Sequence, residues 1–144
     1  MKRPLLAFAL MSVLGACTPA AGPTQMVQVY EGQARILLLP QPYRLTFTVN
    51  PATHELRGTL EQRRTGDRFE VTGTLLDTAD GEELTAQVSA GAAPRFNATL
   101  LGFGVTGLSL KADALLSGRI SHRVLDGHLR VGGVRYALTM RRVQ

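Results

Sequence analysis

Thiols and indole rings are nearly absent from this sequence of 144 residues, which has one cysteine, Cys17, and no tryptophan. A single cysteine excludes a disulfide within the chain and metal sites that need several thiolates. His54-Glu55 begins like a zinc-protease motif, but Gly58 stands where the second histidine would be. No serine occupies a nucleophile elbow. The sequence therefore predicts no catalytic residues, no metal site and no cofactor.

Long apolar runs and massed charges are also missing. A helix that spans a bilayer needs about 20 apolar residues, and the longest run, Pro4–Leu14, is shorter. Hydrophobic residues make up 44% of the chain and charged residues 19%, a composition typical of one globular domain. The formal net charge is +5, and the basic residues are scattered, so nucleic-acid binding is not expected.

The N-terminus has the layout of a secretory signal, with basic residues, then an apolar run, then small residues. Met1–Arg3 is followed by Pro4–Leu14, and Gly15 and Ala16 lead to Cys17. The segment Leu14–Cys17 resembles the lipobox of bacterial lipoproteins, and the resemblance covers residues 1–17 only. It implies a diacylglycerol on the Cys17 thiol, cleavage just before Cys17 and acylation of the new amino group. Two or three acyl chains together would anchor the protein stably.

This interpretation divides the chain into a signal peptide (1–16), a lipidated cysteine with a flexible tether (17–25) and a single domain (26–144). The tether sequence TPAAGPTQ consists of proline, glycine and small or polar residues. Thr18 is not the aspartate that retains such proteins at the inner membrane. The resemblance therefore implies the cell envelope, and the periplasmic side of the outer membrane if the host has two membranes. The alternative is an incidental cysteine in a signal that is cut further on, for example after Ala20.

Apolar and polar residues alternate through most of the domain, a pattern typical of antiparallel strands with one buried face. The clearest segments are 43–50, 55–61, 68–75, 83–88 and 134–141. Asp126-Gly127 and Gly132-Gly133 predict two-residue hairpin turns, and Arg64–Asp67 predicts another turn. The sequence predicts an all-β fold: an antiparallel meander of eight to eleven strands, without a helix, closed as a small β-barrel because closure hides the edge strands. A two-sheet β-sandwich is the alternative.

Five residues are expected to face inward and to line a ligand cavity if the barrel is open. They are Phe47, Leu60, Phe69, His122 and Tyr136. A repeated pattern, apolar-x-Gly-x-apolar, places Gly58, Gly73 and Gly118 in mid-strand on the same inward face. Such glycines either allow the barrel to curve or leave room for a ligand.

A basic cluster is predicted to face the membrane. If Val27–Tyr30 and Arg35–Leu39 are the first two strands, the turn at 64–67 falls at the same barrel end as Cys17. Arg63, Arg64 and Arg68 would then lie beside anionic head groups. The alternative is a solvated hairpin tip without a partner.

Two functions remain open. The first is a lipid-anchored barrel, not an enzyme, that binds an apolar small molecule or lipid inside. The second is a structural or assembly protein with a filled core, which meets another envelope protein through its outer surface. A G-x-G-x-x-G match at residues 102–107 resembles a dinucleotide-binding loop, but the antiparallel pattern around it leaves no doubly wound sheet.

Overall fold

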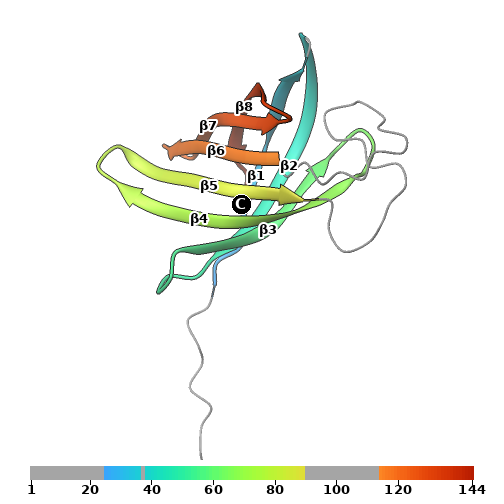
Figure 1. The fold of residues 1–144 in the computed structure, drawn as a ribbon. Coiled ribbons are helices and arrows are strands. Elements are labelled where there is room, and N and C mark those ends of the chain that lie inside the picture. The colour runs from blue at the N-terminus through green and yellow to red at the C-terminus, as the bar shows by residue number, and fades with distance from the viewer. Residues whose placement is uncertain (1–24, 37, 90–113) are drawn as a thin grey trace, which may run out of the picture.

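The computed structural model describes residues 25–36, 38–89 and 114–144, so Cys17 and the 102–107 segment lie outside the described residues. The described residues form strands and turns, and they include no helix that could cross a membrane. The strands, labelled in Figure 1, are β1 (Gln28–Ile36), β2 (Leu39–Val49), β3 (Glu55–Gln62), β4 (Arg68–Thr78), β5 (Gly81–Ser89), β6 (Ala114–Ser121), β7 (Val124–Val131) and β8 (Val134–Arg142). The all-β prediction is confirmed.

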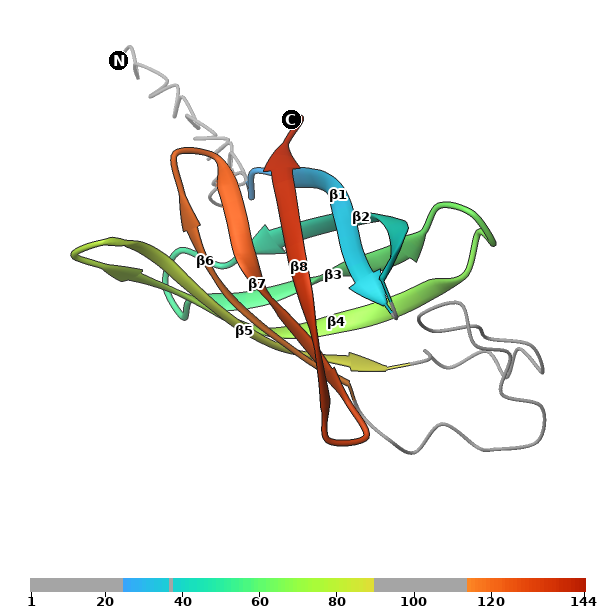
Figure 2. The ribbon, with the colours of Figure 1, turned by 90° about the horizontal axis from the view of Figure 1, so that it is seen from above.

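Each strand pairs antiparallel with the next one, and β8 pairs back onto β1 to close a barrel. In the closing pair Tyr30 lies opposite Arg142 and Ala34 lies opposite Leu138. Figure 2 shows β8 beside β1 after one circuit of the meander. Closure gives every strand two hydrogen-bonded neighbours, which removes the exposed edges that an open sheet would have. The barrel, rather than the sandwich, is therefore the fold.

The two ends of the barrel are named here by the chain. The entry end is the one where Gln25 leads into β1. Because directions alternate, the β2–β3, β4–β5 and β6–β7 turns lie at the entry end together with the C-terminus. The β1–β2, β3–β4 and β7–β8 turns lie at the opposite, far end.

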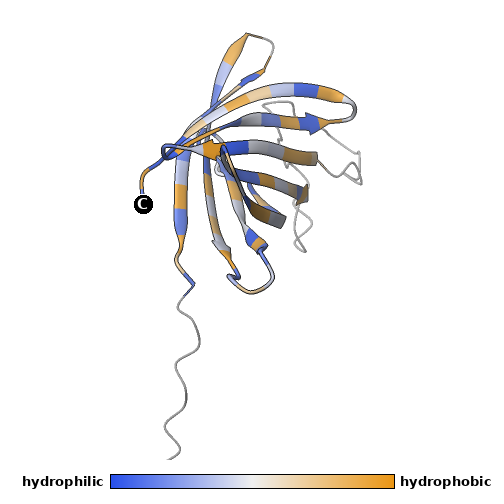
Figure 3. Cartoon of the chain, turned by 90° about the vertical axis from the view of Figure 1, so that its left-hand side faces the viewer, coloured by the Kyte–Doolittle hydropathy of each residue, from blue (hydrophilic) through white to orange (hydrophobic). Residues whose placement is uncertain are grey.

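The predicted alternation holds along most strands, as the colour changes in Figure 3 show. Tyr43, Leu45 and Phe47 of β2 are buried, and they belong to one continuous core cluster inside the barrel. Polar residues on the other side of each strand face outward. Burial of one apolar face per strand is what drives the meander to close around a common core.

The start of the barrel differs from the prediction, because one strand, Gln28–Ile36, replaces the two expected at Val27–Tyr30 and Arg35–Leu39. Gly32 falls between the two expected strands. It lies inside β1, where a Cβ atom would stand 2.0 Å from the carbonyl oxygen of Thr139. This glycine therefore marks a close approach to β8 and not a turn. The number of strands before the 64–67 turn falls by one.

The turn between β6 and β7 also differs from the prediction. Asp126-Gly127 lies within β7, and the turn is at His122-Arg123, where both residues have positive φ angles of 49° and 67°. Gly127 faces Gly118 on β6, so the glycine that suggested a turn again serves a close approach between strands. The predicted Gly132-Gly133 turn is confirmed, with both φ angles positive.

One inward assignment beside that turn is wrong. The alternation over 134–141 predicts that Val134 faces inward, but its side chain is 53% exposed at the far end, where it lies opposite Val131 of β7. The strand leaves the core there, because Tyr136 is the first residue of β8 that packs on the core cluster. Leu138 and Met140 follow it inside, as expected.

Candidate functional site

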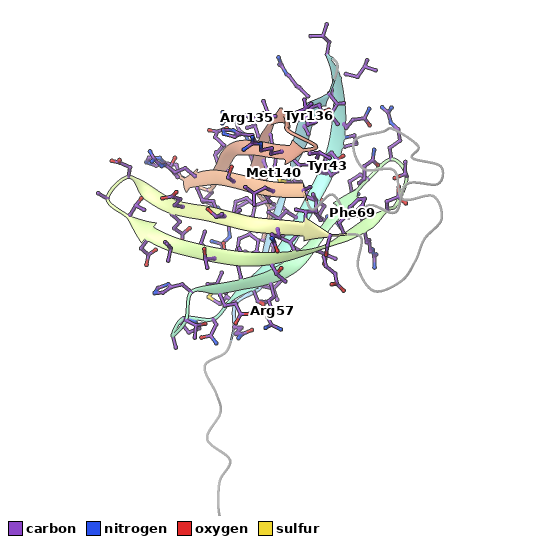
Figure 4. All side chains as sticks on the ribbon, in the orientation of Figure 1. Tyr43, Arg57, Phe69, Arg135, Tyr136 and Met140 are labelled. Carbon is purple, nitrogen blue, oxygen red and sulfur yellow. The ribbon has the colours of Figure 1, made fainter. Side chains whose placement is uncertain are left out.

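The centre of the barrel is filled by side chains. Phe47, Leu60 and Phe69, predicted to line a cavity, are at most 2% exposed and pack in the core cluster. The rings of Tyr30 and Phe47 stack with their centroids 5.7 Å apart. Tyr136 is half-buried and packs against the same cluster (Figure 4). Four of the five predicted lining residues are thus core residues, held by packing rather than placed around an open space.

His122 is not inside the barrel. The sequence placed it on the inward face between Ile120 and Val124, but β6 ends at Ser121 and His122 is an exposed turn residue at the entry end. The alternation ends with the strand, so the inward assignment is wrong for this residue.

The mid-strand glycines leave no room for a ligand. A Cβ atom on Gly58 would stand 2.1 Å from the carbonyl oxygen of Thr46, and one on Gly73 would stand 2.1 Å from that of Thr85. On Gly118 the nearest atom would be the carbonyl oxygen of Asp126 at 2.7 Å. The space next to each glycine is filled by the backbone of the neighbouring strand, which favours tight curvature over a ligand cavity.

A buried pair of glutamines closes the far end, and the sequence analysis missed it. Gln62 Nε2 donates a hydrogen bond of 3.1 Å to Gln41 Oε1. Gln62 Oε1 accepts hydrogen bonds from the backbone N–H groups of Arg64 and Thr65, at 2.6 and 2.7 Å. Among the described residues no buried side-chain polar atom lacks a partner. The available signal was Gln62 continuing the inward series of β3 two residues after Leu60.

The entry end carries a depression of about 560 Å³. Its lining includes Tyr30 and Ile120 of the core, together with the charged residues Glu82, Arg123 and Arg142. The Tyr30 hydroxyl lies 3.3 Å from Gln28 Oε1, to which it donates a hydrogen bond. Burial raises the pKa of Tyr30, and the nearby charge of Arg142 partly opposes this effect. Tyr30 is therefore a neutral hydrogen-bonding group at ordinary pH and does not act as a base.

The rim of this depression includes the strained β6–β7 turn. His122 and Arg123 both adopt the left-handed conformation, which costs a non-glycine residue about 1–2 kcal/mol. The turn holds both side chains at the rim, beside a half-buried Arg142. Within the described ranges no group of three or more His, Cys, Asp or Glu side chains could hold a metal ion. The lining of the depression thus combines charged side chains with apolar ones.

The predicted membrane-facing arginines lie at the wrong end. Arg63, Arg64 and Arg68 flank the β3–β4 turn at the far end, opposite Gln25, because β1 is one strand and not two. Arg63 Nη1 lies 3.3 Å from Glu31 Oε1, and Arg68 Nε lies 3.5 Å from Glu61 Oε2. Two of the three charges thus have carboxylate partners within the barrel. The prediction that these arginines contact a membrane at the entry end is therefore wrong.

A different set of arginines gathers on the outside of the closing strands. We define the basic face as Arg35 of β1, Arg130 of β7, and Arg135 and Arg141 of β8, all of them exposed. Arg130 and Arg135 are directly opposite one another, and Arg135 contacts the ring of His128. An outer groove of about 530 Å³ runs between β1 and β8, with Arg35 and Arg141 in its lining. Sequence reasoning missed this face because β1 and β8 meet only on closure.

Comparison of the chain with protein-family models, curated proteins and solved structures finds no match. The barrel offers a filled core, a depression with charged and apolar side chains at the entry end, and a basic outer face.

Proposed function

We propose that this protein is a lipid-anchored protein of the bacterial envelope whose barrel is a filled scaffold that acts through its outer surface. The observation that carries the proposal is the packed interior. One core cluster contains the buried side chains of Phe47, Leu60 and Phe69. The backbone of neighbouring strands fills the space beside the inward glycines. A barrel packed to this extent keeps its shape, and it presents binding groups on the outside or at its ends.

The anchoring half of the proposal depends on the lipobox-like segment Leu14–Cys17. The eight residue-to-residue steps from Cys17 to Gln25 can span at most about 28 Å when fully extended. An acylated Cys17 would therefore keep the start of the barrel within about 28 Å of the membrane surface. If the host has two membranes, Thr18 favours the periplasmic side of the outer one.

Acylation is tested by expressing the full chain and its Cys17→Ser variant in a bacterial host. The mature protein is expected to begin at Cys17, to carry the mass of two or three acyl chains and to sediment with membranes. The Cys17→Ser protein is expected to be released in soluble form or to stay as uncut precursor. A mature wild-type protein that begins at Ala21, or that retains a free Cys17 thiol, would refute the anchor.

Binding of a small polar molecule at the entry end is a second candidate function. It is favoured by the depression in which Tyr30, Arg123 and Arg142 meet. The packed core argues against the apolar ligand that the sequence analysis expected inside the barrel. Native mass spectrometry of the protein purified from its host is expected to show a small bound molecule that the Arg142→Gln variant loses. A ligand retained by that variant would place binding elsewhere.

A further inference from the structure

We propose that the barrel lies on its side, with the basic face and the rims of β1 and β8 against an anionic lipid surface. The proposal deepens the proposed function, because it assigns a partner to the outer surface, but it does not depend on acylation of Cys17. The first observation is charge. Residues 114–144 contain six arginines and one acidic residue, Asp126. None of the four arginines of the basic face forms an ion pair with another described residue.

The two acidic side chains near this face do not cancel its charge. Glu31 lies opposite Arg141 on β8 and lines the same outer groove. Its carboxylate, however, forms ion pairs with Arg44 and Arg63. Asp126 has Arg119 as its cross-strand neighbour on β6. Arg130 and Arg135 instead oppose each other directly, an arrangement that destabilises a sheet unless an anion lies between the two charges. The face therefore attracts an external anionic partner.

The second observation is the placement of exposed apolar side chains at both rims of the same side. At the far end these are Leu38 and Leu39 of the β1–β2 hairpin, with Val134 after the β7–β8 turn. At the entry end they are Met26, Val27 and Val143, where β1 begins and β8 has ended. The remaining exposed large hydrophobic side chains of the described residues are Leu76 of β4 and Leu115 of β6.

Leu38 is the clearest of these side chains. It is 95% exposed, and its φ angle of 70° lies in the left-handed region that glycine or asparagine adopts at lower cost. The hairpin that carries it projects from the barrel in Figures 1 and 3. A leucine here is unfavourable both for the backbone and for solvation in water. Insertion into the acyl boundary of a membrane would remove the second penalty.

Arginines flanked by apolar side chains favour a lipid surface over a protein or nucleic acid. Peripheral membrane proteins combine apolar residues that enter the acyl boundary with basic residues at the head groups. The opposite side of the barrel carries more acids than bases, and an anionic surface repels it. The outward acids of β3, β4 and β5 are Glu55, Glu61, Glu70 and Glu83, and the outward bases are Arg57 and Arg68. Repulsion there and attraction at the basic face act together to orient the barrel.

The anchor is compatible with this orientation. The tether enters β1, which itself belongs to the docking side, so an acylated Cys17 would lie near one end of that side. The acidic strands β3–β5 would then face away from the membrane. A second copy of the chain, presenting its acidic side to the basic face, is the competing occupant, and the test below distinguishes it.

The test uses residues 17–144 with Cys17→Ser, which retain all eight strands and lack acyl chains. Cooperative thermal unfolding is confirmed first for every variant. Sedimentation with phosphatidylcholine vesicles is then measured with and without phosphatidylglycerol. Binding is expected only with phosphatidylglycerol, and high salt should weaken it. The variant R35Q/R130Q/R135Q/R141Q should bind about 1,000-fold more weakly.

A control variant separates the effect of this face from that of net charge. R57Q/R64Q/R68Q removes three charges from β3, β4 and the turn between them, and Figure 4 shows Arg57 and Arg135 on opposite sides of the barrel. Its vesicle binding should stay within about threefold of the parent chain, because each distant charge acts weakly across a screening length. Equal loss in both variants, or no binding to anionic vesicles by the parent chain, would overturn the proposal. So would self-association that only the basic-face variant abolishes, without vesicle binding.

A second measurement locates the contact. In the Cys17→Ser chain an added cysteine is the only thiol, so Leu38→Cys and Leu76→Cys can each carry one environment-sensitive fluorophore. The label at position 38 should shift to the blue with anionic vesicles, and the label on β4 should not. Equal shifts, or a shift only at position 76, would refute this orientation. Because the chain lacks acyl groups, failure here is distinguishable from failure of the Cys17 anchor.

Discussion

Substitution of Gly73 by alanine tests whether the inward glycines are structural. The added Cβ would lie 2.1 Å from the Thr85 carbonyl oxygen and 2.4 Å from the Ala86 Cα. Both are backbone atoms of β5, so relief requires the two strands to separate. Overpacking of a core costs about 1–3 kcal/mol, and a clash with backbone belongs at the upper end of that range. Loss of glycine entropy in the unfolded chain returns about 0.4–1 kcal/mol.

The net loss for Gly73→Ala is therefore expected to be about 2 kcal/mol, or about 8 °C in melting temperature for a domain of this size. The assay is denaturant unfolding followed by circular dichroism, with a thermal scan beside it. Gly132→Asn is the control, because nothing lies within 4 Å of a Cβ there and asparagine tolerates its φ of 55°. A Gly73→Ala protein as stable as that control would refute the close-approach argument. Such a result would reopen the cavity interpretation.

Three further predictions concern other parts of the barrel. Gln62→Leu leaves Gln41 and two backbone N–H groups without their hydrogen-bond partner, so it should lower the free energy of unfolding by about 1–3 kcal/mol. Denaturant titration measures this change, and an unchanged midpoint of unfolding would contradict it. Because burial raises the pKa of Tyr30, its contribution to stability is present below the unfolded value of 10.0 and is lost as the pH rises through the folded value. Tyr30→Phe should therefore flatten the fall of the unfolding midpoint above pH 10, and an unchanged slope would rule out this role. Leu38→Asn should raise stability by about 1 kcal/mol by relieving the left-handed backbone while weakening vesicle binding, and a stability loss would show that Leu38 packs on the barrel.

The strand pattern could be predicted because it is local. Alternation in segments such as 43–50 and 68–75 reports directly which side chains face the core, and those assignments are confirmed. Closure followed from the lack of any helix to cover a sheet edge. Residues such as Phe47 and Phe69 were correctly placed inside, but whether they would line a cavity or fill one depends on the barrel radius. No local pattern encodes that radius.

The misplaced turns share one cause, which is that glycine has two structural uses. Gly32 falls in an expected break and Gly127 in an expected turn, because glycine permits both a positive φ and the close approach of a neighbouring backbone. Only the partner strand distinguishes the two uses. In this barrel the partners are Thr139 on β8 and Ser117 on β6, whose carbonyl oxygens would stand 2.0 and 2.2 Å from the added Cβ atoms.

By itself, then, the sequence predicted most of the strands and their buried faces, since each depends on neighbouring residues. The export signal at residues 1–17 stays a prediction. The tertiary structure alone decided which turns share an end, because one misplaced turn reverses the direction of every later strand. It also decided that Arg35 of β1 and Arg141 of β8 line one groove beside the closing pair. Residues so distant in the chain become neighbours only when the hydrogen bonds between β1 and β8 close the barrel, and no period in the sequence reports that contact.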